Sequence, residues 1–425
     1  MKSKNLFICS PNLGVLDTAL PLIKYQRDVL NKKFSILFTK SNVSKSFNDD
    51  VFLAKHGKLF FDEFIFVSES GVWFKSSNFD EFQKINLCFI KYKYLISRVE
   101  NYSQKYIFFK LLNYIFKSIL LFAEKLIFSS NITSIKEICK NIDVAIYDIL
   151  EIKKVYFKEL RKHLQDKKKL SVMHGISVLE SKETGNFIDE KYDNFLTILA
   201  FSESEKKFFL DFGVEKSDIF VSGVFKHDKD WFEFINSKRE PCIFSDPVVL
   251  FSRSESDYFD ITRKRLALEN IKKVILEDNN YKIVIKTHFK SKNNDIYYEV
   301  FGRENYNDNW TFSDDHQFNL GMNARFTLTF YSSICIDMLR MGIPNIEYLD
   351  LRGLKNFDNQ YSLRDKNNYP VFDYRYNGLV IPSQDLASLK DAVSTVKKLS
   401  AEDIKKKYFS LFPEKSNLTF LSKVS

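Results

Sequence analysis

Short apolar runs alternate with longer segments of helical periodicity through the first half of the chain. The runs that predict strands are residues 6–9, 34–38, 144–147, 170–173, 196–201 and 221–223. After a loop at residues 10–17, a helical pattern continues to residue 30, and further helical stretches fill much of residues 79–140. Strands that alternate with helices, without hairpin signals, predict an α/β domain with a mainly parallel sheet.

A second series of the same kind follows a polar, charged stretch at residues 226–246, which indicates a linker. Its predicted strands are residues 248–251, 281–286, 325–329 and 345–348, and its predicted helices are residues 262–277, 334–341, 386–398 and 401–409. We therefore predict an α/β protein with two Rossmann-like domains, residues 1–235 and 236–425, facing each other across a cleft. The late helices are expected to pack back on the first domain. Ligands in such sheets bind at the carboxyl ends of the strands.

Composition narrows the class of protein. The 425 residues carry 64 Lys and Arg against 55 Asp and Glu, a formal net charge of +9, with 12 Gly and 43 Phe. So much aromatic surface needs a packed interior, which excludes collagen-like and disordered classes. The lysines are interleaved with Asp and Glu, apart from residues 167–169, which argues against nucleic acid as a partner. The first apolar run is too short for a signal peptide, so we expect a cytoplasmic protein.

The sequence offers no pattern typical of a metal or cofactor site. The five cysteines are scattered and form no CxxC pair, which argues against a disulfide framework and a structural zinc site. HExxH, GxxxxGK[ST] and a GxGxxG after the first strand are all missing, as is a tight Asp-x-Asp in a strand-end loop. We therefore expect no metal and no cofactor.

Residues 106–128 are apolar and nearly long enough to span a bilayer. Lys110, Lys117 and Glu124 recur every seven residues, however, so they form one polar stripe on an otherwise apolar helix. Such charges are costly within a membrane. The segment is interpreted either as a buried helix with one wet edge or as a helix that docks on a membrane surface, aided by Lys105 and Lys125.

Polar side chains follow two predicted strands of the second domain. Lys286 and His288 stand at the end of one strand, and Ser332 and Ser333 lie where the next strand meets a helix. Hydroxyls and free N–H groups at a helix N-terminus form an anion site, to which a Lys and a His on a neighbouring strand add charge and hydrogen bonds. The alternative for the two serines is a plain helix cap.

Similar candidates occur in the first domain. His174 and Gly175 follow one predicted strand, Asp148 ends another, and Gly14 lies in the loop after the first strand. A His followed by Gly at a strand end can meet a ligand at the cleft edge. For His174 and Asp148 the alternative is a satisfied side chain in a turn.

Arg253, Glu255 and Asp257 follow the first strand of the second domain. They can supply a cation for a phosphate and a carboxylate base, or they can form an ordinary solvated loop. The histidines in polar surroundings are expected at the surface. They are His56, His163 and His316.

The second domain resembles the nucleotide-binding half of GT-B glycosyltransferases that use cytidine-activated donors. Bacterial sialyltransferases and Kdo transferases of this type hold the donor phosphate with a His-Pro and a Ser-Ser motif. His288, followed here by Phe289 in place of Pro, and Ser332-Ser333 occupy the matching places. Residues 332–349, including Glu347, resemble the stretch around the donor nucleoside.

A broader resemblance, over residues 140–350, is to CDP-glycerol glycerophosphotransferases of teichoic-acid synthesis. His174-Gly175 matches their first-domain His-Gly. Residues 201–204 and 223–228 are similar to the segment that leads into their linker, although only Lys226 and Asp228 of its Pro-Lys/Arg-x-Asp survive.

These resemblances imply an inverting, metal-independent GT-B glycosyltransferase of bacterial capsule or lipopolysaccharide synthesis. It would move a Kdo or sialic-acid type sugar from a CMP-linked donor to a glycan acceptor, lipid-linked or free, in the cytoplasm and at the periphery of the inner membrane. Glu255 or Asp257 is expected as the base, with His174 and Asp148 as alternatives. The donor-binding set is Gly14, Arg253, Lys286, His288, Ser332, Ser333 and Glu347. The alternatives are a CDP-glycerol or CDP-ribitol phosphotransferase and a non-catalytic basic binding protein.

Overall fold

The computed structural model describes residues 4–9, 13–67, 72–87, 131–148, 160–173, 175, 196–211, 213–288 and 294–420, together with the single positions 115 and 118. His174 and almost all of the helix expected at residues 106–128 lie outside the described residues. Among the residues that are described, no helix combines the length and the apolar character needed to cross a membrane.

The first sheet has the order β5-β4-β3-β2-β1-β6-β7-β8-β9. Its parallel strands are β1 (Lys4–Cys9), β2 (Lys33–Phe38), β3 (Glu63–Val67), β6 (Ile142–Tyr147), β7 (Lys168–Val172), β8 (Leu196–Ala200) and β9 (Ile219–Val221). Most of these strands are continuous apolar runs, as expected for parallel strands buried on both faces. The predicted strands of this half are confirmed, with shifts of a few residues at their ends.

One edge of the first sheet differs from the prediction. β4 (Trp73–Ser76) pairs antiparallel with β3, and β5 (Ile132–Thr133) pairs antiparallel with β4. The expectation of no hairpins was therefore wrong here. Cross-strand aromatic packing stabilises this edge, since the Phe66 and Phe74 rings stack with centroids 5.2 Å apart.

Helices cover the first sheet and follow its strands. They are α1 (Gly14–Asp28), α2 (Ser41–Asp49), α3 (Val51–Lys55), α6 (Ile135–Lys140) and α8 (Glu203–Asp211), with short 3-10 turns at η1 (Gly57–Phe60) and η5 (Lys216–Asp218). α1 starts earlier than expected, so Asp17 lies in its first turn rather than in a loop. Thr18 Oγ1 donates to Gly14 O at 2.9 Å in that turn.

The second sheet is fully parallel in its described strands and has the order β12-β11-β10-β13-β14-β15. The strands are β10 (Val248–Ser252), β11 (Ile283–Thr287), β12 (Trp310–Phe312), β13 (Phe326–Thr329), β14 (Asn345–Tyr348) and β15 (Ile381–Ser383). β10 separates β11 from β13. The expectation that His288 and Lys286 lie on a strand next to that of the serines was therefore wrong, because the crossover order is not encoded in strand sequences.

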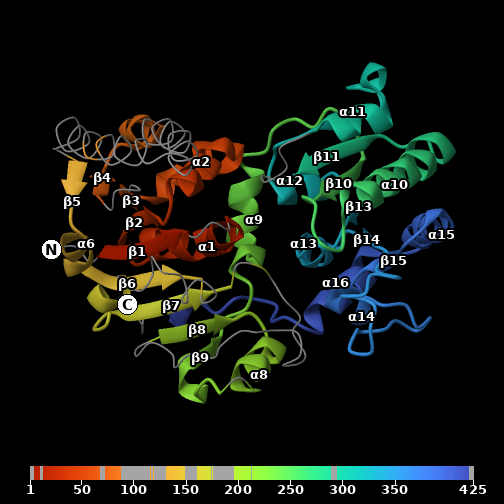
Figure 1. Ribbon diagram of the computed structural model, residues 1–425. Coiled ribbons are helices and arrows are strands. Elements are labelled where there is room, and N and C mark those ends of the chain that lie inside the picture. The colour runs from red at the N-terminus through yellow and green to blue at the C-terminus, as the bar shows by residue number, and fades with distance from the viewer. Residues whose placement is uncertain are drawn as a thin grey trace.

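The helices of the second domain pack on both faces of this sheet (Figure 1). They are α10 (Ile261–Ile271), continued as a π-helix (Lys272–Asp278), α11 (Asp295–Phe301), α12 (Gln317–Met322), α13 (Ile334–Met341), α14 (Asp373–Tyr376) and α15 (Leu386–Val396), with a 3-10 turn at η8 (Arg303–Asn305).

The segment between the sheets is structured, where the sequence indicated a polar linker. A 3-10 turn, η6 (Phe225–His227), and α9 (Lys229–Asn236) replace its first half, and Figure 1 shows α9 between the two sheets. The linker interpretation was wrong for these residues because Lys226 and His227 are buried against partners distant in sequence.

The C-terminal segment returns to the first domain. α16 (Ala401–Phe409) packs on α13, and the chain then runs back to β9 and ends its described part in η9 (Leu418–Phe420). The N–H of Asn417 donates to Ser222 O at 2.7 Å, and the Phe420 and Phe220 rings stack with centroids 3.9 Å apart.

Candidate functional site

The turn between β13 and α13 is held in an unusual conformation. Tyr331 has a φ of 68°, a left-handed value that is uncommon for a residue with a side chain. Its carbonyl accepts a hydrogen bond from Arg253 Nη1 at 2.9 Å, and its hydroxyl donates to Asp373 Oδ1 at 3.0 Å. Its ring packs on Phe372, 4.3 Å between centroids. Strained backbone held from several sides is typical of functional turns.

The two serines that follow are half-buried, and their hydroxyls make few contacts with the described residues. The N–H of Ile334 makes only a long contact of 3.4 Å to Ser332 Oγ. Ser333 is the N-cap of α13, and its side chain makes no capping hydrogen bond. The hydroxyls therefore stand at the positive end of the α13 dipole, where an anion is stabilised.

The first domain reaches this turn. A Cβ built on Gly175 would lie 3.6 Å from Ser333 Oγ. Gly175 therefore meets the Ser-Ser turn from the first domain, as a site shared between the two domains requires.

Lys286 points elsewhere. Its Nζ donates to the carbonyl of Asp315 at 2.8 Å and to that of Asp314 at 3.2 Å, beyond the end of β12. The structure does not bring it to Ser332 and Ser333, because two strand spacings separate β11 from β13. His288 is half-buried directly after β11.

Glu347 lies inside the second domain on β14, with 1% of its surface exposed. Its Oε1 is 3.3 Å from Arg375 Nε, yet neither carboxylate oxygen has a hydrogen-bond partner among the described residues. Burial, only partly offset by the Arg375 charge, raises the pKa of Glu347 to about 7. A buried, unsatisfied carboxyl with a raised pKa close to the strained turn is a candidate functional group.

The expected bases differ in their surroundings. Glu255 and Asp257 are exposed on the loop after β10. Glu255 Oε1 accepts from Lys264 Nζ at 3.1 Å. Slight burial raises the pKa of Glu255, but hydrogen bonds from its own N–H and from Lys264 outweigh this effect and lower it overall. A lowered pKa makes Glu255 a weaker base.

The first-domain candidates are more sheltered. Asp148 is buried at the end of β6, and Gly14 opens α1. Asp148 directly follows β6, at the carboxyl end of that strand, whereas Gly14 was expected in a loop and is instead the first residue of α1. Among the described residues no group of His, Cys, Asp and Glu is arranged to hold a metal ion.

Sequence reasoning missed a buried polar network at the domain junction. Lys226 Nζ lies 2.9 Å from Asp337 Oδ2 and 3.7 Å from Asp17 Oδ2. His227 Nε2 lies 2.7 Å from Asp337 Oδ1, and its Nδ1 lies 2.7 Å from Tyr408 Oη. The carboxylate can only accept, so His227 donates through Nε2 and accepts from Tyr408. Burial lowers the pKa of His227 to about 4, which keeps the ring neutral.

His316 completes this network from the second domain. It was expected at the surface but is only 4% exposed. Its Nδ1 accepts from the Phe318 N–H, so its Nε2 carries the proton donated to Asp17 Oδ1 at 3.0 Å. Gln317 donates to Asp17 Oδ2 at 2.8 Å. Burial opposes ionisation of Asp17, but the hydrogen bond from His316 and the charge of Lys226 hold its pKa well below the usual range.

One sequence signal pointed to this network. Asp337 is a lone carboxylate within the apolar run Ile334–Met341, and an acid at such a position needs a buried cation. The partners could not be located from the sequence, because Lys226 is 111 residues away.

No protein-family model matches the sequence, and no curated protein matches it. Several solved structures share its fold. They include an S. aureus MnaA–UDP co-structure (TM-score 0.56, 11% identity, covering 100% of this chain and 94% of that one). UDP-GlcNAc 2-epimerase from Neisseria meningitidis bound to UDP-GlcNAc is also similar in fold (TM-score 0.52, 10% identity, covering 100% of this chain and 98% of that one). So is the wall teichoic acid polymerase TagF (TM-score 0.51, 10% identity, 100% and 87% covered). The predicted fold class is therefore confirmed: the chain is an α/β protein of the GT-B fold, with two Rossmann-like domains.

Proposed function

We propose that the protein is an inverting, metal-independent glycosyltransferase whose donor is a CMP-linked acidic sugar of the Kdo or sialic-acid kind. The observation that carries the proposal is the Tyr331–Ser333 turn, pinned by Arg253 and Asp373 and met by Gly175 from the other domain. A fixed turn at a helix N-terminus suits a leaving phosphate, which needs stabilisation in the transition state.

The residues around the turn have different proposed roles in binding the donor. Ser332 and Ser333 donate hydroxyl hydrogen bonds to the phosphate, and the α13 dipole adds positive potential. Arg253 fixes the Tyr331 carbonyl and brings its own charge to the same place. Glu347 and His288, at the ends of β14 and β11, flank the donor. All of these groups act by hydrogen bonding and charge. The reaction therefore needs one further group, a general base that takes the proton of the acceptor hydroxyl.

Four residues are proposed for that base: Glu255, Asp257, Asp148 and His174. The ion pair with Lys264 lowers the pKa of Glu255 and so makes it a weaker base than an unpaired glutamate. Replacing each by its amide or by Asn, and measuring transfer at several pH values, identifies the one whose loss removes the acidic limb of the pH profile, where a general base becomes protonated.

A CDP-glycerol or CDP-ribitol phosphotransferase is the second candidate. Its support is the approach of Gly175 to Ser333, because a phosphate bound at the turn would then lie near the first-domain backbone. In that reaction His174 would take the proton of the acceptor hydroxyl, and the Ser-Ser turn would hold the transferred phosphate.

Thermal shifts distinguish these proposals. CMP-Kdo, CMP-sialic acid, CDP-glycerol and UDP-GlcNAc are each added at about one hundred times Kd, where a bound ligand adds roughly 2.7 kcal/mol. We expect stabilisation by a CMP-sugar in the wild type and none in the S332A/S333A double variant, with K406A on α16 as the surface control. Stabilisation by CDP-glycerol alone selects the phosphotransferase, and by UDP-GlcNAc alone refutes cytidine specificity. Binding of heparin or DNA with a steep salt dependence, and of no nucleotide, indicates a basic binding protein.

Membrane association is part of the same proposal. The net charge of +9 suits both an anionic donor and an anionic membrane surface. Flotation with vesicles containing anionic lipid, compared with neutral vesicles, tests it. Equal absence of the protein from both vesicle fractions refutes peripheral association.

A further inference from the structure

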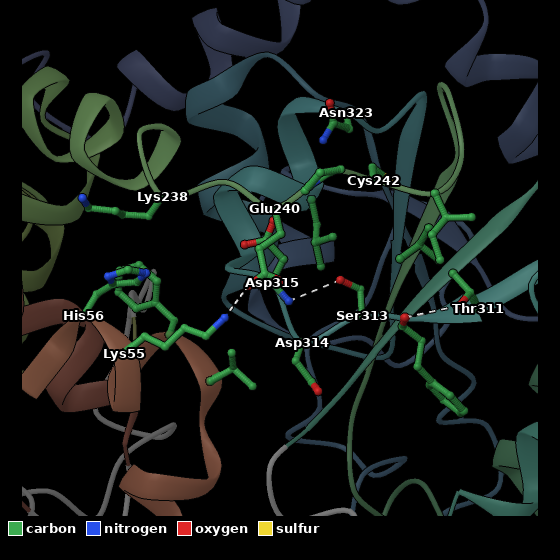
Figure 2. Close-up of a pocket in the computed structure, with 17 residues that line it drawn as sticks. Lys55, His56, Lys238, Glu240, Cys242, Thr311, Ser313, Asp314, Asp315 and Asn323 are labelled. Carbon is green, nitrogen blue, oxygen red and sulfur yellow. Dashed lines mark hydrogen bonds and ion pairs between the residues drawn. The ribbon is translucent and has the colours of Figure 1, made fainter.

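A second cavity, of about 290 Å³, lies at the domain junction away from the Ser-Ser turn. Its walls come from α3 and His56 of the first domain, from residues 238–243 between the domains, and from the second domain, where β11, the end of β12 with the turn at residues 313–315, and α12 line it. Figure 2 shows Lys55, His56 and Lys238 on one side of the cavity and Ser313 with Thr311 on the other. None of the residues proposed above to hold the donor or act as the base lines it.

The polar groups of this cavity fall into two sets. On the first-domain side, Lys55 pairs with Glu240 at 2.5 Å. Lys238 is exposed at the rim, where its Nζ lies 5.8 Å from the centre of the Phe234 ring and forms no ion pair with a described residue. On the opposite side, the Asp315 carboxylate accepts from the His316 N–H at 2.7 Å and from Asn319 at 2.9 Å. The Asp314 carboxylate, in contrast, engages no described residue.

The cavity therefore presents an unpaired cation with an imidazole at one side and an unpaired carboxylate at the other. Apolar side chains lie between them, among them Phe52 and Leu320, which are both buried. Charged groups at opposite rims of a cavity attract a ligand that carries the complementary charges, and charge-assisted hydrogen bonds orient it. The volume is at the small end of the range for ligand pockets, so it fits a monosaccharide-sized molecule better than a nucleotide sugar.

We propose that this cavity binds a small dipolar ligand, with an anionic group at Lys238 and His56 and an amine at Asp314. A phosphorylated amino sugar has this chemistry. The ligand would join α3 to the 313–315 turn, whose backbone carbonyls hold Lys286 and whose Asp315 is hydrogen bonded to the His316 N–H. Its binding would therefore stabilise the observed placement of the two domains.

His56 offers a direct readout. Burial and the charges of Lys238 and Lys55 lower the pKa of its imidazole, with only Glu240 acting the other way. A bound anion would oppose those cations and raise the pKa. The imidazole resonances of His56, assigned by their loss in H56N, are followed by NMR in the full-length protein while glucosamine 6-phosphate is added.

We expect saturable shifts, a raised His56 pKa, and binding weakened at least tenfold in K238A and in D314N. Glucose 6-phosphate, which lacks the amine, should bind more weakly than glucosamine 6-phosphate to the wild type but equally to D314N. K406A serves as the matched control for loss of a surface lysine and should bind as the wild type does. Unmoved His56 resonances at millimolar ligand, unchanged affinity in K238A or D314N, or equal affinity for the two sugar phosphates in the wild type would each overturn the proposal.

Discussion

Asp337 is the residue whose loss should most clearly disturb the domain junction. Its side chain is fully buried and accepts from both Lys226 and His227. In D337N the amide oxygen can still accept from His227, so the substitution removes chiefly the charge that balances Lys226. Lys226 is then left buried with Asp17 at 3.7 Å as its remaining carboxylate. Breaking one partner of a buried pair costs about 3–5 kcal/mol.

Urea unfolding followed by the fluorescence of Trp231, buried on the neighbouring α9, measures this cost. The double variant D337N/K226M removes both charges and should recover part of the loss, since Asp17, the carboxylate that remains, keeps its hydrogen bonds from His316 and Gln317. The exposed pair of Asp403 and Lys406 provides the control, and D403N should leave the transition unchanged. Additive losses in the double variant, or a D337N transition at the wild-type urea concentration, would refute the reasoning.

Three further outcomes follow from buried polar groups. Burial, opposed by the Phe201 N–H, raises the pKa of Glu205 to about 8. Because Glu205 ionises at lower pH in the unfolded chain than in the folded protein, the free energy of unfolding should fall as pH rises from about 4.5 to 8. E205Q should flatten that fall, and equal pH slopes for E205Q and the wild type would contradict the prediction. The low pKa of His227 means that the unfolded chain takes up a proton first, so the free energy of unfolding falls as pH drops from about 6.5 to 4. In acid unfolding, the stability of H227Q should depend less on pH over this range than that of the wild type. Y331F loses the hydrogen bond to Asp373 and should lower the unfolding free energy by about 1.5–3 kcal/mol. An unchanged midpoint would show that ring packing and the Arg253 hydrogen bond hold the turn without the hydroxyl.

The elements that were predictable from the sequence are those fixed by local pattern. The run at residues 248–251 is apolar over its whole length, and its strand β10 lies between β11 and β13, so the signal of burial on both faces was clear. The turn at Ser332-Ser333 was found because a strand end, two hydroxyls and a helix start are contiguous.

The parts that could not be predicted depend on contacts between distant residues. His316 lies in polar surroundings in the sequence, yet it is buried against Asp17, 299 positions away. Lys226 and His227 looked like linker residues because their partners, Asp337 and Tyr408, are contributed by other helices. Polarity in the sequence predicts exposure only when no buried partner of opposite character is available.

The network and the proposed donor turn are joined by one helix. Ser333 is the N-cap of α13 and Asp337 lies four residues later, so helical periodicity brings the two side chains to the same face. That face meets the first-domain side at both points, since Ser333 lies beside Gly175 and Asp337 holds Lys226. The buried charges therefore set the position of the turn relative to the first domain. D337N should accordingly weaken CMP binding at a temperature where it is fully folded, whereas D403N should not. If folded D337N binds CMP as tightly as the wild type, the network stabilises the fold without positioning the turn.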